Sequence, residues 1–334
     1  MMKKVVKLFP LVCLVIMLTA GGGAAIAAGS SDQAASGAKW PARDITVIVN
    51  MGAGGDTDYN GRLLCRYLEK ELGVSIPVSN VPGSNGAIAN AQYKDGNPDG
   101  YTFLVTNTVA LSGNEATGLS DFGYDSFSPV AIFGKQSGEN LIVPANSPYK
   151  TMQDFIDASK AKPDTIKYAI STGGGAYISY VIMSQAGGAK LVPIDAGDGA
   201  ARMASLLGGH VDAAIVPYAT AKEYIEAGRV KTLATFMGES PTLLKDVPPA
   251  KDVIPEAVLP TMYIMLAPKG TDPAAVEGMN KAILNIIKNN AEYKAECEKF
   301  NFQSPFALDV QGTLKELEAQ RKHFMIFSKF LGKK

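Results

Sequence analysis

The sequence is poor in the residues that build metal centres and catalytic triads. Its 334 residues include two histidines and three cysteines, and neither their spacing nor their neighbours suggest a metal site. His210 follows two glycines at the end of an expected helix, so we interpret it as a surface or capping residue rather than a catalytic base. The nucleophile motif G-x-S-x-G does not occur. These absences argue against an enzyme, with or without a metal or another cofactor.

The chain also has no excess of positive or negative charge. The chain carries 32 Lys and Arg against 32 Asp and Glu, and no dense basic run precedes its last few residues. Nucleic-acid binding is therefore not expected. A hydrophobic content of 46% and a charged content of 19% are typical of a globular protein with a core. The length allows two domains.

The N-terminus has the pattern of a secretory signal peptide. Three lysines precede an apolar run at 8–20, and an A-x-A arrangement follows at 25–27. The run is too short to span a bilayer comfortably. Gly21 stands where a lipoprotein signal would have its cysteine. We expect a cleaved signal peptide over 1–27, followed by a flexible polar segment over 28–39.

Two cysteines, Cys65 and Cys297, remain once the predicted leader is removed. In an exported protein they could form a disulfide. Two buried free thiols are the alternative, and the sequence leaves both open.

The rest of the chain alternates between strand and helix patterns, which indicates α/β units with mostly parallel sheets flanked by helices. One helix is expected over 58–73, where leucines recur at every fourth position and Gly73 marks the end. The expected strands cover 45–50, 75–80, 101–107, 141–144, 166–171, 190–195, 212–217, 231–236 and 262–268. The other expected helices cover 87–94, 151–162, 201–209, 220–228, 271–290, a segment after 176 and the region 308–331.

Two glycine-rich loops follow strands and precede helices, at 53–58 (AGGDTD, the first glycine loop) and 171–176 (STGGGA, the second glycine loop). Backbone N–H groups and the helix dipole at such a turn suit an anion such as a carboxylate. No lysine follows as in a P-loop, and the third glycine of a dinucleotide fingerprint is missing. If two domains face each other, both loops would line one cleft.

Acidic residues in these loops are less expected. Asp58 could cap the first helix or contact a ligand. Asp56 would repel an anion unless the ligand also carries a cationic or hydroxyl donor. Asp195 and Asp198 raise the same question, with solvated loop charges as the alternative.

The order of motifs resembles the periplasmic receptors of tripartite tricarboxylate transporters, the Bug family. The resemblance covers nearly the whole chain after the leader. The segments that carry it are Trp40-Pro41, GAGGDTDYNGR at 52–62, NVPGSNG at 80–86, PDGYTFLV at 98–105, YDSFSPVAIFG at 124–134, LIVPANSPYKTMQDFI at 141–156, LLGGHVDAAI at 206–215, AGRVKTLATF at 227–236 and APKGTDPAAVEGMN at 267–280.

The resemblance implies a two-domain periplasmic binding protein with a Venus-flytrap fold and without catalysis. Such a receptor captures a small carboxylate between its domains and delivers it to a membrane permease; presenting ligand to a membrane sensor kinase is the alternative. We expect a monomer with one domain formed by 40–140 plus 261–334 and the other by 141–260. Hinge closure around the ligand is the expected motion.

Carried over to this sequence, the resemblance implies a ligand site formed by both glycine loops, with Asn85 and Thr106 as second-rank candidates. The first loop contributes Ala53, Gly54, Gly55, Asp56, Thr57 and Asp58. The second contributes Ser171, Thr172, Gly173 and Gly175, with Asp195 at the rim.

Two departures from the family pattern concern the ligand. Asn50 replaces a usual proline, and Asp195 stands where a lysine is frequent. The exchange of lysine for aspartate changes the local charge by two units, which disfavours a tricarboxylate. We hypothesise a monocarboxylate, or an amphoteric ligand whose ammonium or hydroxyl group meets Asp56 or Asp195.

Overall fold

The computed structural model describes residues 40–328 and 330. The predicted signal peptide and flexible segment lie outside these residues. Within the described part, no helix is long and apolar enough to cross a membrane.

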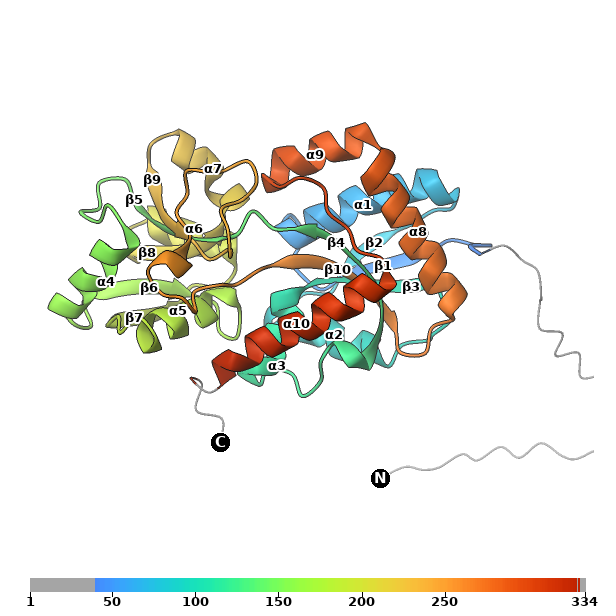
Figure 1. The fold of residues 1–334 in the computed structure, drawn as a ribbon, viewed down its shortest axis with the longest axis horizontal. Coiled ribbons are helices and arrows are strands. Elements are labelled where there is room, and N and C mark those ends of the chain that lie inside the picture. The colour runs from blue at the N-terminus through green and yellow to red at the C-terminus, as the bar shows by residue number, and fades with distance from the viewer. Residues whose placement is uncertain (1–39, 329, 331–334) are drawn as a thin grey trace, which may run out of the picture. The chain divides into compact units, whose positions relative to one another are not determined.

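The first of two sheets is built from both ends of the described chain (Figure 1). Its strand order is β2-β1-β3-β10-β4. The strands are β1 (Thr46–Val49), β2 (Val78–Asn80), β3 (Thr102–Asn107), β4 (Phe127–Lys135) and β10 (Met262–Pro268). We call this sheet and its helices the first α/β part.

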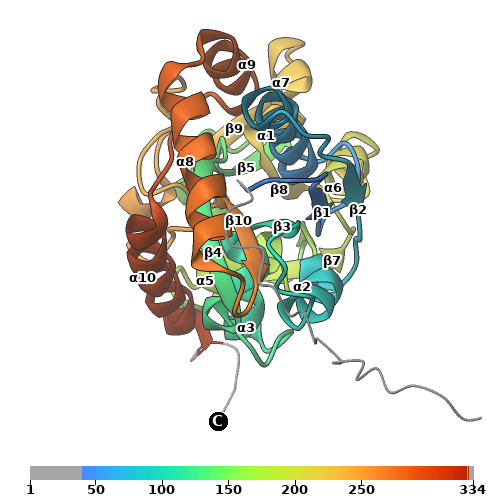
Figure 2. The same ribbon diagram turned by 90° about the vertical axis from the view of Figure 1, so that its right-hand side faces the viewer.

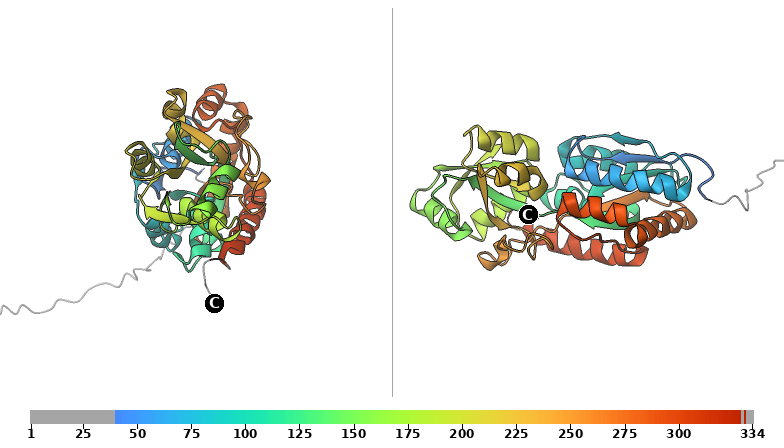
Figure 3. Two further views of the ribbon diagram at one scale, coloured as in Figure 1. Left: turned by 90° about the vertical axis from the view of Figure 1, so that its left-hand side faces the viewer. Right: turned by 90° about the horizontal axis from the view of Figure 1, so that it is seen from above.

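The second sheet is built from the middle of the chain, in the order β7-β6-β8-β5-β9. Its strands are β5 (Glu139–Pro144), β6 (Ile166–Ile170), β7 (Leu191–Asp195), β8 (Ala213–Pro217) and β9 (Val230–Thr235). We call this sheet and its helices the second α/β part, and Figure 3 shows it with helices on both faces of its strands.

Both sheets are mixed, whereas the sequence predicted mostly parallel ones. The α/β class is confirmed, but β10 runs antiparallel to β3 and β4, and β5 runs antiparallel to β8 and β9. These antiparallel strands flank the places where the chain passes between the sheets. It crosses once through residues 136–138, the crossover, and returns between β9 and β10. The predicted domain division at 140/141 and 260/261 stays a prediction.

Successive side chains of a strand point to opposite faces of the sheet, so the core of the first part has two layers. Val47 and Val49 of β1 pack on the side of α1 and α8, while Ile48 between them packs on the side of α2 and α10. Figure 2 shows these helices around the strands. The helices of the structure are α1 (Asp56–Leu72), α2 (Ala87–Lys94), α3 (Asn114–Thr117), α4 (Met152–Ala161), α5 (Gly175–Gln185), α6 (Gly199–Leu207), α7 (Tyr218–Glu226), α8 (Pro273–Asn289), α9 (Ala291–Asn301) and α10 (Val310–Ser328).

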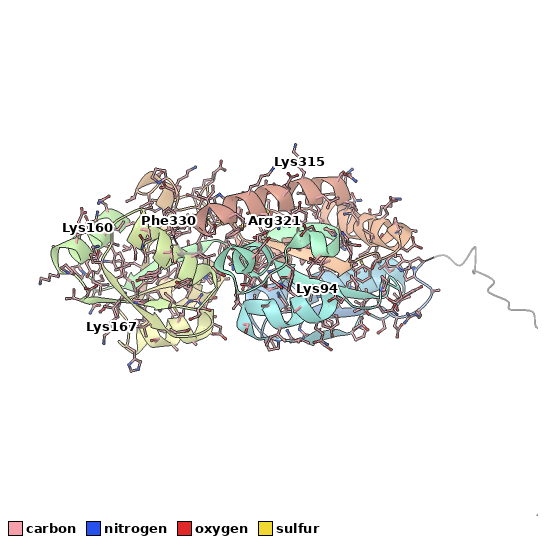
Figure 4. All side chains as sticks on the ribbon, turned by 90° about the horizontal axis from the view of Figure 1, so that it is seen from below. Lys94, Lys160, Lys167, Lys315, Arg321 and Phe330 are labelled. Carbon is pink, nitrogen blue, oxygen red and sulfur yellow. The ribbon has the colours of Figure 1, made fainter. Side chains whose placement is uncertain are left out.

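The C-terminal helix α10 contacts both α/β parts. Leu317 packs in the core of the first part, whereas Phe324 and Phe327 pack with residues of α5 in the second. Arg321, labelled in Figure 4, pairs with Glu115 of α3 and Asp125. The helix therefore joins the two parts independently of the crossing strands.

Three of these elements were not predicted from the sequence: β4, the short helix α3 and α9. Strand β4 contains Pro129, which usually argues against a strand, but β4 is the last strand of its sheet and an edge strand tolerates proline. Helix α9 directly follows α8, and the Asn290 side chain at its start accepts a hydrogen bond from the Tyr293 N–H. Its sequence is rich in charged residues and gives a weak helical pattern.

The two cysteines do not form a disulfide. Cys65 on α1 and Cys297 on α9 are free thiols buried in the core of the first part. Burial raises the pKa of Cys65 to about 12, so this thiol is protonated and unreactive near neutral pH. Cys297 accepts a hydrogen bond from the Asn301 amide at 3.4 Å. Of the two alternatives from the sequence, the structure has the buried free thiols.

Candidate functional site

The first glycine loop is held in shape by Asp58. Its Oδ2 accepts the Gly54 N–H at 2.9 Å, and its Oδ1 accepts Arg62 Nε at 2.8 Å and Asn80 Nδ2 at 2.7 Å. The Asp58 side chain is 4% exposed. Its carboxylate is thus occupied by Gly54, Arg62 and Asn80. The expectation that Asp58 caps the helix is wrong, because Gly55 is the N-cap of α1 and no side chain caps it. Ala53, Gly54 and Gly55 are exposed in front of it.

Asp56 begins α1 and is only partly exposed. Its Oδ2 accepts hydrogen bonds from Gln136 Nε2 and, at 3.1 Å, from the Tyr263 hydroxyl. Burial raises the pKa of Asp56, and the hydrogen bonds from Gln136, Tyr263 and the backbone of Asp56 and Thr57 oppose the shift. The acid therefore occupies the N-terminus of its own helix, where a ligand anion was expected.

Thr57 and Thr106 lie beneath the surface. Thr57 Oγ1 accepts a hydrogen bond from the Asn107 amide at 3.1 Å, and both threonines are buried. Thr106 Oγ1 accepts a 2.7 Å hydrogen bond from the amide of Asn50, the residue that replaces a usual proline. Thr57 and Thr106 therefore help to support the first glycine loop through buried hydrogen bonds.

The loop around Asn85 lies between the two glycine loops. A Cβ added to Gly86 would stand 2.2 Å from Asn50 Nδ2, directly behind the first glycine loop. The Asn85 amide donates to Asn114 Oδ1 at 2.8 Å, and Asn114 donates back to the Asn85 carbonyl. On the other side, Asn85 Oδ1 lies 3.4 Å from the Cβ position of Gly174.

The second glycine loop contacts the first α/β part directly. Gly173 and Gly175 are buried, and a Cβ on Gly173 would meet Leu119 Cδ2 at 2.8 Å. The backbone N–H groups of Gly175 and Ala176 at the start of α5 find no acceptor among the described residues. The second loop thus presents free donors next to a surface of the other part.

Asp195 lies at the end of β7 and is exposed. The Thr172 hydroxyl donates to its Oδ2, and the Gly197 N–H donates to its Oδ1 at 3.1 Å. The hydrogen bond from Thr172 is the main cause that lowers the pKa of Asp195. Asp198 accepts the Ala201 N–H at 2.9 Å as the N-cap of α6. Asp195 and Asp198 therefore both accept hydrogen bonds from within the second part. His210, which the sequence suggested to be a surface or capping residue, is exposed.

Three residues near the site were missed at the sequence level: Gln136, Glu139 and Tyr263. Glu139 is 8% exposed, and its pKa is raised to about 7, chiefly by burial, with Arg202 opposing the shift and Asp56 adding to it. The signal that could have found Gln136 and Glu139 is the polar run KQSGEN between two apolar strands. Tyr263 carries no signal in the sequence, because it lies inside an apolar strand.

The structure brings residues of both parts next to one another. Asp56 is hydrogen-bonded to Gln136 of the crossover, and Asn85 adjoins the second glycine loop. Two mixed-sheet α/β parts, joined by crossing strands and with loops from both at one place, define a solute-binding protein.

Residues 61–327 match the model of the tripartite tricarboxylate transporter family receptor, so the chain belongs to this family. Its members are solute-binding proteins, which confirms the expectation of a binding protein rather than an enzyme.

Individual relatives and a solved structure agree with this family assignment. The chain is 30% identical over 266 residues to a UPF0065 protein of Bordetella bronchiseptica, covering 77% of each. It is 29% identical over 263 residues to Protein BugT of Bordetella pertussis, covering 77% of this chain and 80% of the relative. A solved structure described as that of a periplasmic transporter superposes with a TM-score of 0.76 at 26% identity, covering 87% and 97% of the two chains.

Proposed function

We propose that this receptor captures a small organic acid between its two α/β parts in the periplasm. It then delivers the acid to a membrane permease of the tripartite tricarboxylate type. The predicted signal peptide over 1–27 supports export, and the family supports the permease class. The predicted domains, 40–140 plus 261–334 and 141–260, would close around the ligand.

The observation that carries the proposal is the start of α5. The N–H groups of Gly175 and Ala176 lack acceptors among the described residues, and the loop before them is packed against Leu119 and Asn85 of the first part. A carboxylate at this helix start would accept these hydrogen bonds and interact favourably with the helix dipole.

The acids around the site favour a ligand with little negative charge. Asp56 already occupies the start of α1, and Glu139 is buried near it. A tricarboxylate would bring three further negative charges into this surrounding. A monocarboxylate, or an amphoteric acid that also carries a donor group, fits better. Asp195 is tied to Thr172 and Gly197, so Asp56 is the better placed of the two acids considered for a donor.

A thermal-shift screen of the chain starting near Trp40 tests the function. The compounds are mono-, di- and tricarboxylates, amino acids and aromatic acids. Binding to the native state stabilises it by about 2.7 kcal/mol at a hundredfold excess over Kd. We expect one class of carboxylates to raise the melting temperature. The absence of any shift, with mass spectrometry showing no ligand retained from expression, would contradict the proposal.

A substitution at the rim tests the preference for weakly charged ligands. We expect Asp195→Lys to increase the affinity for a tricarboxylate such as citrate, because it reverses the charge at the rim. If citrate is the tightest ligand of the wild type and Asp195→Lys leaves its affinity unchanged, the preference for weakly charged ligands is wrong.

A further inference from the structure

Glu139 is a buried acid whose side chain has no hydrogen-bond partner among the residues that the structure describes. It is the first residue of β5, and its carbonyl accepts the Phe236 N–H at 2.7 Å, which fixes the backbone. The side chain is 8% exposed, and Oε2 is a buried atom for which residues 40–328 and 330 supply no hydrogen-bond donor. A buried acceptor without a donor destabilises a protein, so such groups are rare unless a ligand or water completes them.

The carboxyl group of Glu139 points to the start of α5, because its Oε1 lies 3.6 Å from the Cβ position of Gly175. Another unpaired buried atom is Gln136 Oε1, on a side chain that is 3% exposed and whose Nε2 donates to Asp56. Both unpaired atoms are acceptors. Glu139 therefore presents an acceptor without a donor beside the helix start that suits a carboxylate, and Gln136 of the crossover adds another unpaired acceptor next to Asp56.

The charged groups around Glu139 do not supply the missing donor. Arg202 of α6 is the nearby cation, but its Nε donates to the Ile215 carbonyl and its Nη1 to the Gly197 carbonyl, both at 2.8 Å. No ion pair joins Arg202 to Glu139 among the described residues. Asp56 of α1 adds negative charge, and burial raises the pKa of Tyr168 of β6 and Tyr263 of β10, so both are neutral.

We propose that Glu139 is a specificity-determining residue that accepts a hydrogen bond from the protonated amine of an amphoteric carboxylate ligand. The ligand carboxylate binds at the start of α5, and its ammonium group faces Glu139 and Gln136. An ammonium group offers three donors and a positive charge, which matches unpaired acceptors beside two acids. This inference rests on the proposed function.

The proton balance of binding follows from this arrangement. Because the pKa of Glu139 is about 7, the unligated protein holds a fraction of a proton on this group at neutral pH. An ammonium group in hydrogen-bond contact favours the ionised Glu139 and lowers its pKa. The ligand carboxylate opposes this shift, but it is engaged by the N–H groups at the start of α5, so we expect binding to release protons. A ligand that placed a second carboxylate here would raise the pKa, and binding would take protons up.

Calorimetric titration in two buffers with different heats of ionisation, near pH 7, measures this balance. The probes are pairs of acids with and without an amine: β-alanine and propionate, γ-aminobutyrate and butyrate, L-aspartate and succinate. In the pair that binds, we expect the acid with the amine to bind at least about tenfold more tightly than the acid without it. This is the difference that one hydrogen bond between charged groups makes. We expect its binding to release protons.

Glu139→Gln keeps the shape of the side chain and removes the charge. We expect it to abolish the proton release and to reduce the preference for the amine-bearing acid at least about tenfold. The matched control is Glu256→Gln, because Glu256 is exposed and forms no ion pair among the described residues. Circular dichroism checks the fold of both variants. The number of protons that the wild type releases on binding tests the proposal even if a variant does not fold.

The outcomes separate the two proposals. Tighter binding of the acid without an amine, proton uptake, or an unchanged preference in Glu139→Gln would overturn the role of Glu139 and leave a carboxylate receptor. If no acid of either kind binds, the proposed carboxylate function is itself overturned, and this inference with it.

Discussion

At the scale of single residues, Gly54 and Gly86 have the same backbone conformation in different surroundings. Both have φ +82°, in the left-handed region that favours glycine. A Cβ on Gly54 would meet nothing within 4 Å, whereas one on Gly86 would lie 2.2 Å from Asn50 Nδ2. Gly54 is thus required by its backbone alone, and Gly86 by its backbone and by the close approach of Asn50.

Alanine substitutions separate these two requirements. We expect Gly54→Ala to lower the free energy of unfolding by about 1 kcal/mol, the cost of the left-handed conformation. Gly86→Ala should lower it by roughly 2–4 kcal/mol, because displacing the Asn50 amide adds an overpacking cost. Urea denaturation measures both. Equal losses would show that the contact between Gly86 and Asn50 has no energetic weight.

Glu139 also makes the stability of the ligand-free protein depend on pH. Its pKa rises from 4.5 to about 7 on folding, so the folded state binds more protons between these values and loses stability as pH rises through them. The full penalty, present above pH 7, is about 3 kcal/mol.

The variant Glu139→Gln removes that penalty. We expect it to raise the melting temperature at about pH 8 and to change it little at about pH 3.5, where Glu139 is mostly protonated in both states. Thermal unfolding of both proteins at the two pH values measures the difference. A variant less stable than the wild type at the higher pH would show that the carboxylate has a stabilising partner.

At the scale of elements, the second glycine loop depends on a side chain of the other α/β part. Gly173 has φ +76°, and its Cβ position lies 2.8 Å from Leu119 Cδ2. Gly209 has a similar φ of +72° but open space around it. The pair distinguishes the effect of the backbone from the effect of the contact between the two parts.

Substitution of these glycines tests whether the contact positions the loop. We expect Gly173→Ala to weaken binding of the acid found in the thermal-shift screen, because the alanine strains the left-handed backbone of the loop and its methyl group crowds Leu119 Cδ2. Adding Leu119→Ala should restore the part of the affinity that the contact costs. Gly209→Ala should cost only the backbone term of about 1 kcal/mol in stability and leave binding unchanged. Failure of the double variant to recover affinity would contradict this role of Leu119.

The elements differ in how far the sequence determines them. Strands β1 and β3 were predicted because runs of β-branched and apolar residues have few alternatives. Strand β4 was missed because its tolerance of Pro129 depends on its place at the sheet edge, which the local sequence does not encode. The same holds for the site. Glycine loops are visible as a pattern, but the burial and missing partner of Glu139 arise only when α5 packs beside the crossover.

At the scale of the whole described chain, the two α/β parts are joined by more than their crossing strands. Tyr218 of α7 packs edge-on against Phe302 with ring centroids 4.8 Å apart, and the Thr242 hydroxyl donates to Gln303 Oε1 at 2.6 Å. The His323 ring on α10 lies 2.7 Å from the Val258 carbonyl. These contacts do not involve the glycine loops. A hinge motion during ligand exchange must therefore either preserve them or break them.

The central claim, that both parts bind one acid, is tested most directly by calorimetric titration of the acid that stabilises the protein most. The titration compares the wild type with Asn85→Ala in the first part, Gly175→Val in the second and Gly209→Ala as the control. The account predicts one bound acid per chain and at least about tenfold weaker binding in each of the first two variants, the loss of at least about 1.4 kcal/mol. Unchanged affinity in either variant, with the control also unchanged, would place the ligand on one part alone and contradict the account.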